Sequence, residues 1–275
     1  MDLDSIYASH PLRAETILGR LERAGADLTR LTAWHLAVDP ETELTDQNHS
    51  GGVQAVLELA VASNITRSSS VVDVGAGIGG PARILAAAFG CRVLAIERDA
   101  GRCRDASELT ERVRLASLVS IRHADALTDS VDVSDADVLW GQGAWVHFPS
   151  ASDFLARWVP ALAVGGRVAM ADAFLVRRPA DRAEEELVTA LEESWGAHLA
   201  PLETWRTALE RQGCRVVHTR DVTARAAADV SMLLSVSTRW PEGTVTDAER
   251  QGWERALAAV GRGIVGSFRV VAARH

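Results

Sequence analysis

The pattern of apolar and polar positions changes its character near residue 70. Before that point, apolar residues recur at helical spacing over residues 11 to 37, and the stretch GGVQAVLELAVASN after Ser50 is typical of a further helix. After it, short β-branched runs alternate with longer segments of helical periodicity. Such an alternation predicts a parallel sheet with crossover helices, so the expected fold class is α/β.

Seven apolar runs have the length and composition of strands. In chain order they are SVVDVG, RVLAIE, VSIRHA, DVLWGQ, RVAMADAFLV, RVVHTRDV and SFRVVAAR. The helical segments between them are GGPARILAAAFG, AGRCRDASELTERVRLA, SDFLARWVPALA and LETWRTALERQG. The last run is expected to pair beside the sixth, antiparallel to its neighbours. We therefore predict a doubly wound, seven-stranded Rossmann-like sheet.

Composition excludes several classes of protein. The formal net charge is -8 and no basic cluster stands clear of acidic residues, which argues against a nucleic-acid partner. No apolar run approaches the roughly 20 residues that span a bilayer, so we expect no membrane partner and a cytoplasmic location. The three cysteines show no Cys-x-x-Cys spacing, and histidines and carboxylates do not cluster, so no disulfide framework and no metal site is predicted.

The chain of 275 residues contains no lysine. A phosphate-binding Gly-Lys-Ser loop, a pyridoxal Schiff base and the Tyr-x-x-x-Lys pair of many nicotinamide reductases all require one. The sequence therefore excludes these three chemistries.

Glycines are concentrated in the stretch VVDVGAGIGGPAR, which follows the first predicted strand directly. A tight turn from a strand into a helix presents backbone N–H groups and the positive end of the helix dipole to a ligand. The spacing of Gly75, Gly77 and Gly80 fits the dinucleotide fingerprint, and Glu97 closes the next strand, where that fingerprint expects a partner for ribose hydroxyls. Taken alone, the motif fits a nicotinamide or another adenosine cofactor.

Two carboxylates favour a cofactor with an amino-acid portion. Asp73 precedes the first glycine by two residues, where it suits a cationic amino group better than a pyrophosphate, and Asp125 in HADAL is placed to accept from the exocyclic amine of adenine. With these features the chain resembles the class I S-adenosylmethionine-dependent methyltransferases (EC 2.1.1), whose first motif reads Asp-x-Gly-x-Gly-x-Gly. The resemblance covers most of the chain.

The resemblance implies S-adenosyl-L-methionine as the cofactor and S-adenosyl-L-homocysteine as its product. Residues at the ends of the first four strands are expected to contact it: Asp73, Gly75, Ala76, Gly77, Glu97, Arg98, Asp125, Ala126 and Gln142. Glu97 is expected to hold the ribose diol, and Gln142 to approach the methionine carboxylate or the methyl group. For Arg98, a solvated surface position is an equally open alternative.

Within that superfamily the stretches DVGAGIGGPAR and VLWGQGAWVHFP resemble small-molecule methyltransferases of natural-product pathways, including sugar O-methyltransferases and tocopherol-type relatives. The resemblance implies that His147 is a general base and that Asp172 supports it. Sugar O-methyltransferases show two adjacent histidines, whereas Val146 precedes His147 here. A histidine bonded to backbone, and a structural aspartate, are the alternatives.

The stretch TDQNHSGG is similar to an Asp-Gln-x-His-x-Gly-Gly segment of those relatives, which implies that Gln47, His49 and Gly51 face the cofactor from the lid side. Gln47 and His49 are accordingly predicted as substrate-binding residues. The alternative is a helix N-cap at Ser50. Eight tryptophans against one tyrosine favour a hydrophobic acceptor, with Trp145 among the residues that contact it. For each tryptophan, core packing is the alternative.

We therefore expect a single methyltransferase domain over residues 1–275. It would comprise an N-terminal helical lid (1–66), a cofactor-binding core (67–179) and a substrate-side half (180–275) with helical insertions at 180–200 and 224–261. The favoured reaction is O-methylation of a small hydrophobic natural product. N- or C-methylation, a non-methylating cyclase and a nicotinamide oxidoreductase stay open, as do the acceptor itself and a homo-oligomeric assembly.

Overall fold

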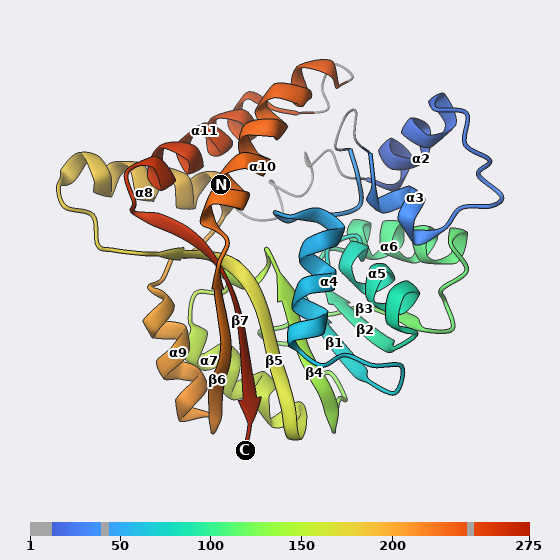
Figure 1. Cartoon of the computed structure of the whole chain (residues 1–275), viewed down its shortest axis with the longest axis horizontal. Helices are drawn as coiled ribbons and strands as arrows, with labels where there is room; N and C mark the ends of the chain where they lie inside the picture. Colours follow the sequence, from blue (N-terminus) through green and yellow to red (C-terminus); the bar gives the residue numbers. More distant parts are fainter. Residues whose placement is uncertain (1–12, 40–43, 241–244) are drawn as a thin grey trace.

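The computed structural model describes residues 13–39, 44–240 and 245–275 (Figure 1). Its centre is a seven-stranded sheet with the order β3-β2-β1-β4-β5-β7-β6. The strands are β1 (Ser70–Val74), β2 (Arg92–Glu97), β3 (Val119–His123), β4 (Ala136–Gln142), β5 (Leu162–Leu175), β6 (Cys214–Asp221) and β7 (Val265–Arg274). All seven predicted strands are present, and the predicted fold class is confirmed.

Strands β1 to β5 pair in parallel, whereas β7 runs antiparallel to both β5 and β6. The prediction for the last strand is thus confirmed. From β1 the chain first adds β2 and β3 on one side of the sheet and then β4 and β5 on the other side. The topological switch point therefore lies between β1 and β4. In open α/β sheets, ligands bind outside the carboxyl ends of the strands at this point.

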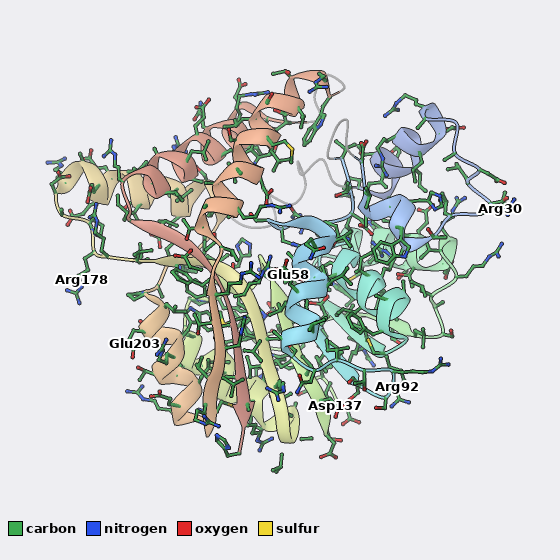
Figure 2. All side chains as sticks on the ribbon, in the orientation of Figure 1. Arg30, Glu58, Arg92, Asp137, Arg178 and Glu203 are labelled. Atoms are coloured by element: carbon green, nitrogen blue, oxygen red, sulfur yellow. The ribbon has the colours of Figure 1, made fainter. Side chains whose placement is uncertain are left out.

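Alternate residues of each strand face the two layers of helices that cover the sheet. Val71 packs into a cluster with α4 (Gly52–Ala62) and α5 (Gly80–Phe89), and Val72 into one with α7 (Ala151–Trp158) and α9 (Leu202–Arg211). The remaining sheet helix, α6 (Ala100–Arg112), packs against β2 and β3. Charged side chains such as Arg30, Arg178 and Glu203 project outward from these layers (Figure 2).

Side-chain caps define several helix ends. Asp99 accepts from the backbone N–H of Arg102 at the start of α6, and Thr246 with Glu249 forms a capping box. The alternative of a helix N-cap at Ser50 is not seen, because α4 begins after Gly51, which has a φ of 86° and no side-chain cap. This left-handed glycine turns the chain into the helix.

The predicted insertions are helical and lie beyond the carboxyl ends of the parallel strands (Figure 1). They are α8 (Arg182–Trp195), α10 (Thr223–Val236) and α11 (Asp247–Gly261). On the N-terminal side, α2 (Ala14–Arg23) packs on α6, and α3 (Ala33–Ala37) packs on α5. The helical pattern expected over 11–37 is interrupted, because Gly25 has a φ of 76° and ends α2; residues 11 and 12 lie outside the described ranges.

The expectation that Trp145 contacts the acceptor is wrong. Its side chain is fully buried, its Nε1 donates to the carbonyl oxygen of Val74, and its ring stacks on Trp205. Trp145 lies in the short 3-10 helix Trp145–His147, where successive side chains point in different directions, so it turns into the core. Within the described ranges, no helix is long and apolar enough to cross a membrane.

Candidate active site

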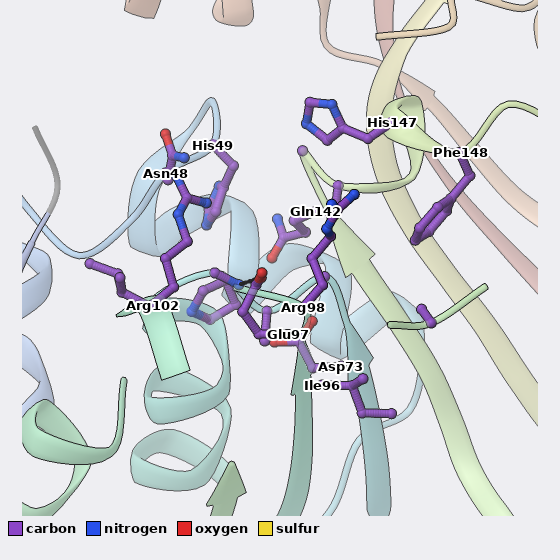
Figure 3. Close-up of a pocket in the computed structure, with 18 of the residues that line it drawn as sticks. Asn48, His49, Asp73, Ile96, Glu97, Arg98, Arg102, Gln142, His147 and Phe148 are labelled. Carbon is purple, nitrogen blue, oxygen red and sulfur yellow. Dashed lines mark hydrogen bonds between the residues drawn. The ribbon is translucent and has the colours of Figure 1, made fainter. Parts of the chain in front are cut away.

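A cavity opens over the carboxyl ends of β1, β2, β3 and β4, and its volume including the open mouth is about 920 Å³. The structure brings together along its wall every residue predicted to contact the cofactor: Asp73, Gly75, Ala76, Gly77, Glu97, Arg98, Asp125, Ala126 and Gln142. His49 and His147 line the same cavity (Figure 3). The roles of these residues stay predictions, but their common location follows from the sheet topology.

The glycine loop, residues 75–80 between β1 and the first turn of α5, needs some of its glycines for contacts within the chain. Gly75 and Gly77 have φ values of 80° and 57°, which favour glycine. A Cβ on Gly75 would lie 2.7 Å from the Cβ of Ala144, and one on Gly80 would lie 2.0 Å from the carbonyl oxygen of Asp46. The third glycine of the fingerprint therefore makes room for the segment before α4 rather than for a ligand.

Two acidic side chains lie side by side at the ends of β1 and β2. Glu97 is buried and accepts from the backbone N–H of Gly77 (2.9 Å) and of Asp99 (2.8 Å). Asp73 is also buried, and among the described residues its Oδ2 has no hydrogen-bond partner. Burial and the neighbouring charge of Glu97 raise the pKa of Asp73 to about 7.

Gln142 ends β4 between these carboxylates and the 3-10 helix. Its side chain is buried, and neither its amide nitrogen nor its amide oxygen has a partner within the part of the chain that the structure describes. Buried polar groups are nearly always hydrogen-bonded, so an orphaned donor and acceptor at a cavity wall indicate a ligand or water there.

His147 is held by a segment that the sequence did not associate with it. Its Nδ1 lies 3.0 Å from the carbonyl oxygen of Gly196, the left-handed residue that ends α8. Since a carbonyl only accepts, Nδ1 carries the proton and Nε2 has the lone pair. Burial lowers the pKa of His147, which keeps the ring neutral near pH 7. The backbone-bonded alternative is thus present and is compatible with a role as base.

Asp172 uses its carboxylate to hold the backbone of the 3-10 turn. Its Oδ2 accepts from the N–H groups of Ala144 (3.3 Å), Trp145 (2.8 Å) and Val146 (3.2 Å). Burial raises the pKa of Asp172 to about 7, against the opposing effect of these hydrogen bonds. Its expected pairing with His147 stays a prediction, whereas the structural alternative has direct support.

Gln47 lies beside the cavity wall rather than in it, and its role as a substrate-binding residue stays a prediction. Its amide bridges Asp46 and His49. Sequence reasoning missed Asp46 and Arg83, whose ion pair is buried at 2.9 Å. The available signal was that Arg83 is the one charged residue in the apolar helix GPARILAAAF. It also missed Arg102, a buried side chain on the cavity wall.

The comparisons with known proteins agree with this architecture. Residues 72–170 match the model of a methyltransferase domain family. The tocopherol O-methyltransferase of Arabidopsis thaliana is 29% identical over 137 residues, which are 47% of this chain and 39% of that protein. Methyltransferase GfsG of Streptomyces halstedii is 24% identical over 69% of this chain and 68% of its own length.

Among solved structures, the geranyl diphosphate C-methyltransferase of Streptomyces coelicolor A3(2), in complex with Mg²⁺, geranyl-S-thiolodiphosphate and S-adenosyl-L-homocysteine, superposes with a TM-score of 0.68. The two sequences are 15% identical, and the superposition covers 97% of this chain and 93% of the other. That likeness shows the fold. This chain spans well under half of the tocopherol O-methyltransferase that it matches. The sheet, the cavity and the matched domain thus agree with the resemblance to the class I S-adenosylmethionine-dependent methyltransferases.

Proposed function

We propose that the protein methylates an oxygen of a small hydrophobic acceptor, with S-adenosyl-L-methionine as the methyl donor. The observation that carries this proposal is the orphaned Oδ2 of Asp73 beside the glycine loop. A buried carboxylate without a partner suits a ligand ammonium, which would supply the missing charge. The amide of Gln142 offers a donor to the ligand carboxylate and an acceptor to its ammonium.

The remaining cavity residues fit the other parts of the cofactor. Glu97 already has both oxygens directed to the loop region, where it can accept from ribose hydroxyls. Asp125 and Ala126 follow β3, where the rim of adenine would lie. When bound, the cofactor supplies an electrophilic methyl group on a sulfonium.

His147 is proposed as the base. The neutral ring directs its Nδ1 proton to Gly196, and Nε2 would accept the proton of the acceptor hydroxyl. In this step the oxygen–methyl bond forms as the sulfur–methyl bond breaks, and the proton passes to Nε2 and then to solvent. Alignment of the three reacting atoms supplies the remainder of the acceleration. Phe148, Leu127 and Ile78 contribute apolar wall, which favours a hydrophobic acceptor.

The test combines binding with transfer. Calorimetry should show binding of S-adenosylhomocysteine and none of NADH, and methyl-labelled cofactor should label members of a panel of phenols and hydroquinones. The His147→Ala variant should lose about 10²- to 10⁴-fold in kcat/KM with an unchanged cofactor Kd. Wild-type turnover in that variant would contradict the base.

Two outcomes would point to the other functions left open by the sequence. Label found on carbon or nitrogen, in a reaction indifferent to His147→Ala, would support C- or N-methylation, in which alignment does most of the work. Conversion of an acceptor without any label would support a non-methylating reaction on the same fold.

A further inference from the structure

Arg102 is a buried cation in the wall of the cavity. It lies in the first turn of α6, where its backbone N–H donates to Oδ1 of the N-cap residue Asp99 (2.7 Å), and its relative exposure is 5%. Arg98, the other described arginine of this wall, is exposed. An arginine is almost never fully buried unless a negative group accompanies it, so the position of Arg102 favours an anion at this wall.

The guanidinium of Arg102 is directed into the cavity. A Cβ on Gly77 would lie 3.6 Å from Nη1 of Arg102, so the guanidinium lies against the glycine loop. Figure 3 shows the side chain extending from α6 toward the segment that carries Asn48 and His49. Burial lowers the pKa of His147, and the charge of Arg102 lowers that pKa further. The positive charge therefore acts on the interior of the cavity as well as on the loop.

The buried charges of the cavity wall are mostly negative. Among the described residues that line the cavity, the buried charged side chains are Asp46, Asp73, Glu97 and Arg102. Asp46 is paired with Arg83, which lies behind the wall. Asp73 and Glu97 are close enough for the charge of Glu97 to add to the effect of burial on the pKa of Asp73. A carboxylate that entered this wall would therefore be repelled by two acidic side chains and attracted by one buried cation.

The amino-acid end of S-adenosylmethionine brings both charges to the cavity, an ammonium and a carboxylate. Asp73 suits the ammonium, and the amide of Gln142 can bond to either group but supplies no charge. Arg102 has the charge opposite to the carboxylate, and a guanidinium can donate two parallel hydrogen bonds to it.

We infer that Arg102 binds the carboxylate of the methionine portion of the cofactor. Asp73 and Arg102 thus recognise the two charges of one zwitterion. The inference rests on the proposed function for the identity of the ligand. Its consequence is selectivity: the protein discriminates against an adenosine nucleoside that has the ammonium but lacks the carboxylate.

The first test compares two ligands of the wild-type protein by calorimetry. S-Adenosylhomocysteine carries both charges, whereas its decarboxylated form keeps only the ammonium. Loss of one partner from a buried charge pair weakens binding by about 10²-fold, so the decarboxylated nucleoside should bind more weakly by about that factor. Equal Kd values would overturn the inference without any substitution. Failure of both nucleosides to bind would overturn the proposed function instead.

The second test removes the guanidinium. Arg102→Met keeps an unbranched side chain, and it should weaken the binding of S-adenosylhomocysteine by about 10²-fold without weakening that of the decarboxylated form. Arg104→Met is the matched control, because Arg104 is exposed on the same helix, and it should bind both nucleosides as wild type does. Equal weakening of both nucleosides by Arg102→Met would indicate a structural role and would overturn the inference, as would an unchanged Kd for each.

Two further variants make the result independent of any one substitution. Arg102→Gln keeps polar atoms in the wall, and it should show the same selective loss even if Arg102→Met does not fold. Asp73→Asn should weaken both nucleosides, because both carry the ammonium. Selectivity for the carboxylate that is as high in Arg102→Gln as in wild type would overturn the inference.

Discussion

Asp73 on β1 and Asp172 on β5 are buried in the same sheet, and burial raises the pKa of each to about 7. Their surroundings differ. The Oδ2 of Asp172 accepts from three backbone N–H groups, whereas the Oδ2 of Asp73 has no partner among the described residues. A raised pKa is therefore common to both carboxylates, and the pattern of hydrogen-bond partners is what distinguishes them.

Removing the Asp172 carboxylate, which accepts these three hydrogen bonds, should have the largest effect on the molecule, and that effect is on stability. Asp172→Ala leaves three buried backbone donors of the 3-10 turn without a partner, at roughly 1 to 3 kcal/mol each. We expect the free energy of unfolding to fall by about 3 to 5 kcal/mol, measured by urea denaturation at pH 7.

The matched variant Asp172→Asn keeps a carbonyl oxygen for those donors, and its stability should stay within about 1 kcal/mol of wild type. If Asp172→Asn folds normally but loses turnover, the negative charge supports His147 after all. Equal stability of Asp172→Ala and wild type would remove the structural assignment.

Removing the charge at Asp73 should have the next largest effect, and on binding rather than folding. Truncation of one partner in a buried charge pair costs about 2 to 5 kcal/mol, so Asp73→Asn should weaken the binding of S-adenosylhomocysteine by about 10²-fold. Calorimetry of the two asparagine variants checks this, because Asp172→Asn should bind the cofactor as wild type does. An unchanged Kd in Asp73→Asn would mean that the ammonium lies elsewhere.

The smallest expected effect is the pH dependence of that affinity. With a pKa of about 7, the Asp73 carboxyl is mostly protonated near pH 6 and mostly ionised near pH 8. Since the ligand ammonium requires the ionised form, affinity should rise about tenfold over this range, with release of a proton. The slope should vanish in Asp73→Asn, and a pH-independent Kd in the wild-type protein would contradict the assignment.

The stability of the protein without ligand should fall as pH rises, whereas the affinity for the cofactor should increase. A carboxyl whose pKa is higher in the folded state binds more protons there than in the unfolded chain, so its contribution to stability is lost as pH rises from about 4 through the folded pKa. Asp73→Asn has no such loss and should unfold at a higher temperature than wild type near pH 8.

The sequence predicted those parts of the molecule that depend on local patterns. The carboxyl ends of parallel strands lie at the same edge of the sheet. Residues such as Asp73, Glu97 and Gln142 could therefore be placed at one cavity from their positions at the ends of predicted strands. The contacts of His147 with Gly196, and of Asp46 with Arg83, join segments 49 and 37 residues apart, and no local pattern encodes such a pairing. Trp145 was misplaced for a related reason: its position in the chain is beside the cavity, but its side chain direction is set by the turn.

The contact of Gly80 with Asp46 has a consequence for the exchange of segments between related enzymes. Arg83 has no exposed surface, and Asp46 is the carboxylate paired with it. A chimaera that took its N-terminal segment from a relative without this aspartate would leave a guanidinium inside the protein without its counter-ion. We therefore expect the segment before α4 to be exchangeable only together with the glycine loop and α5 of the same protein.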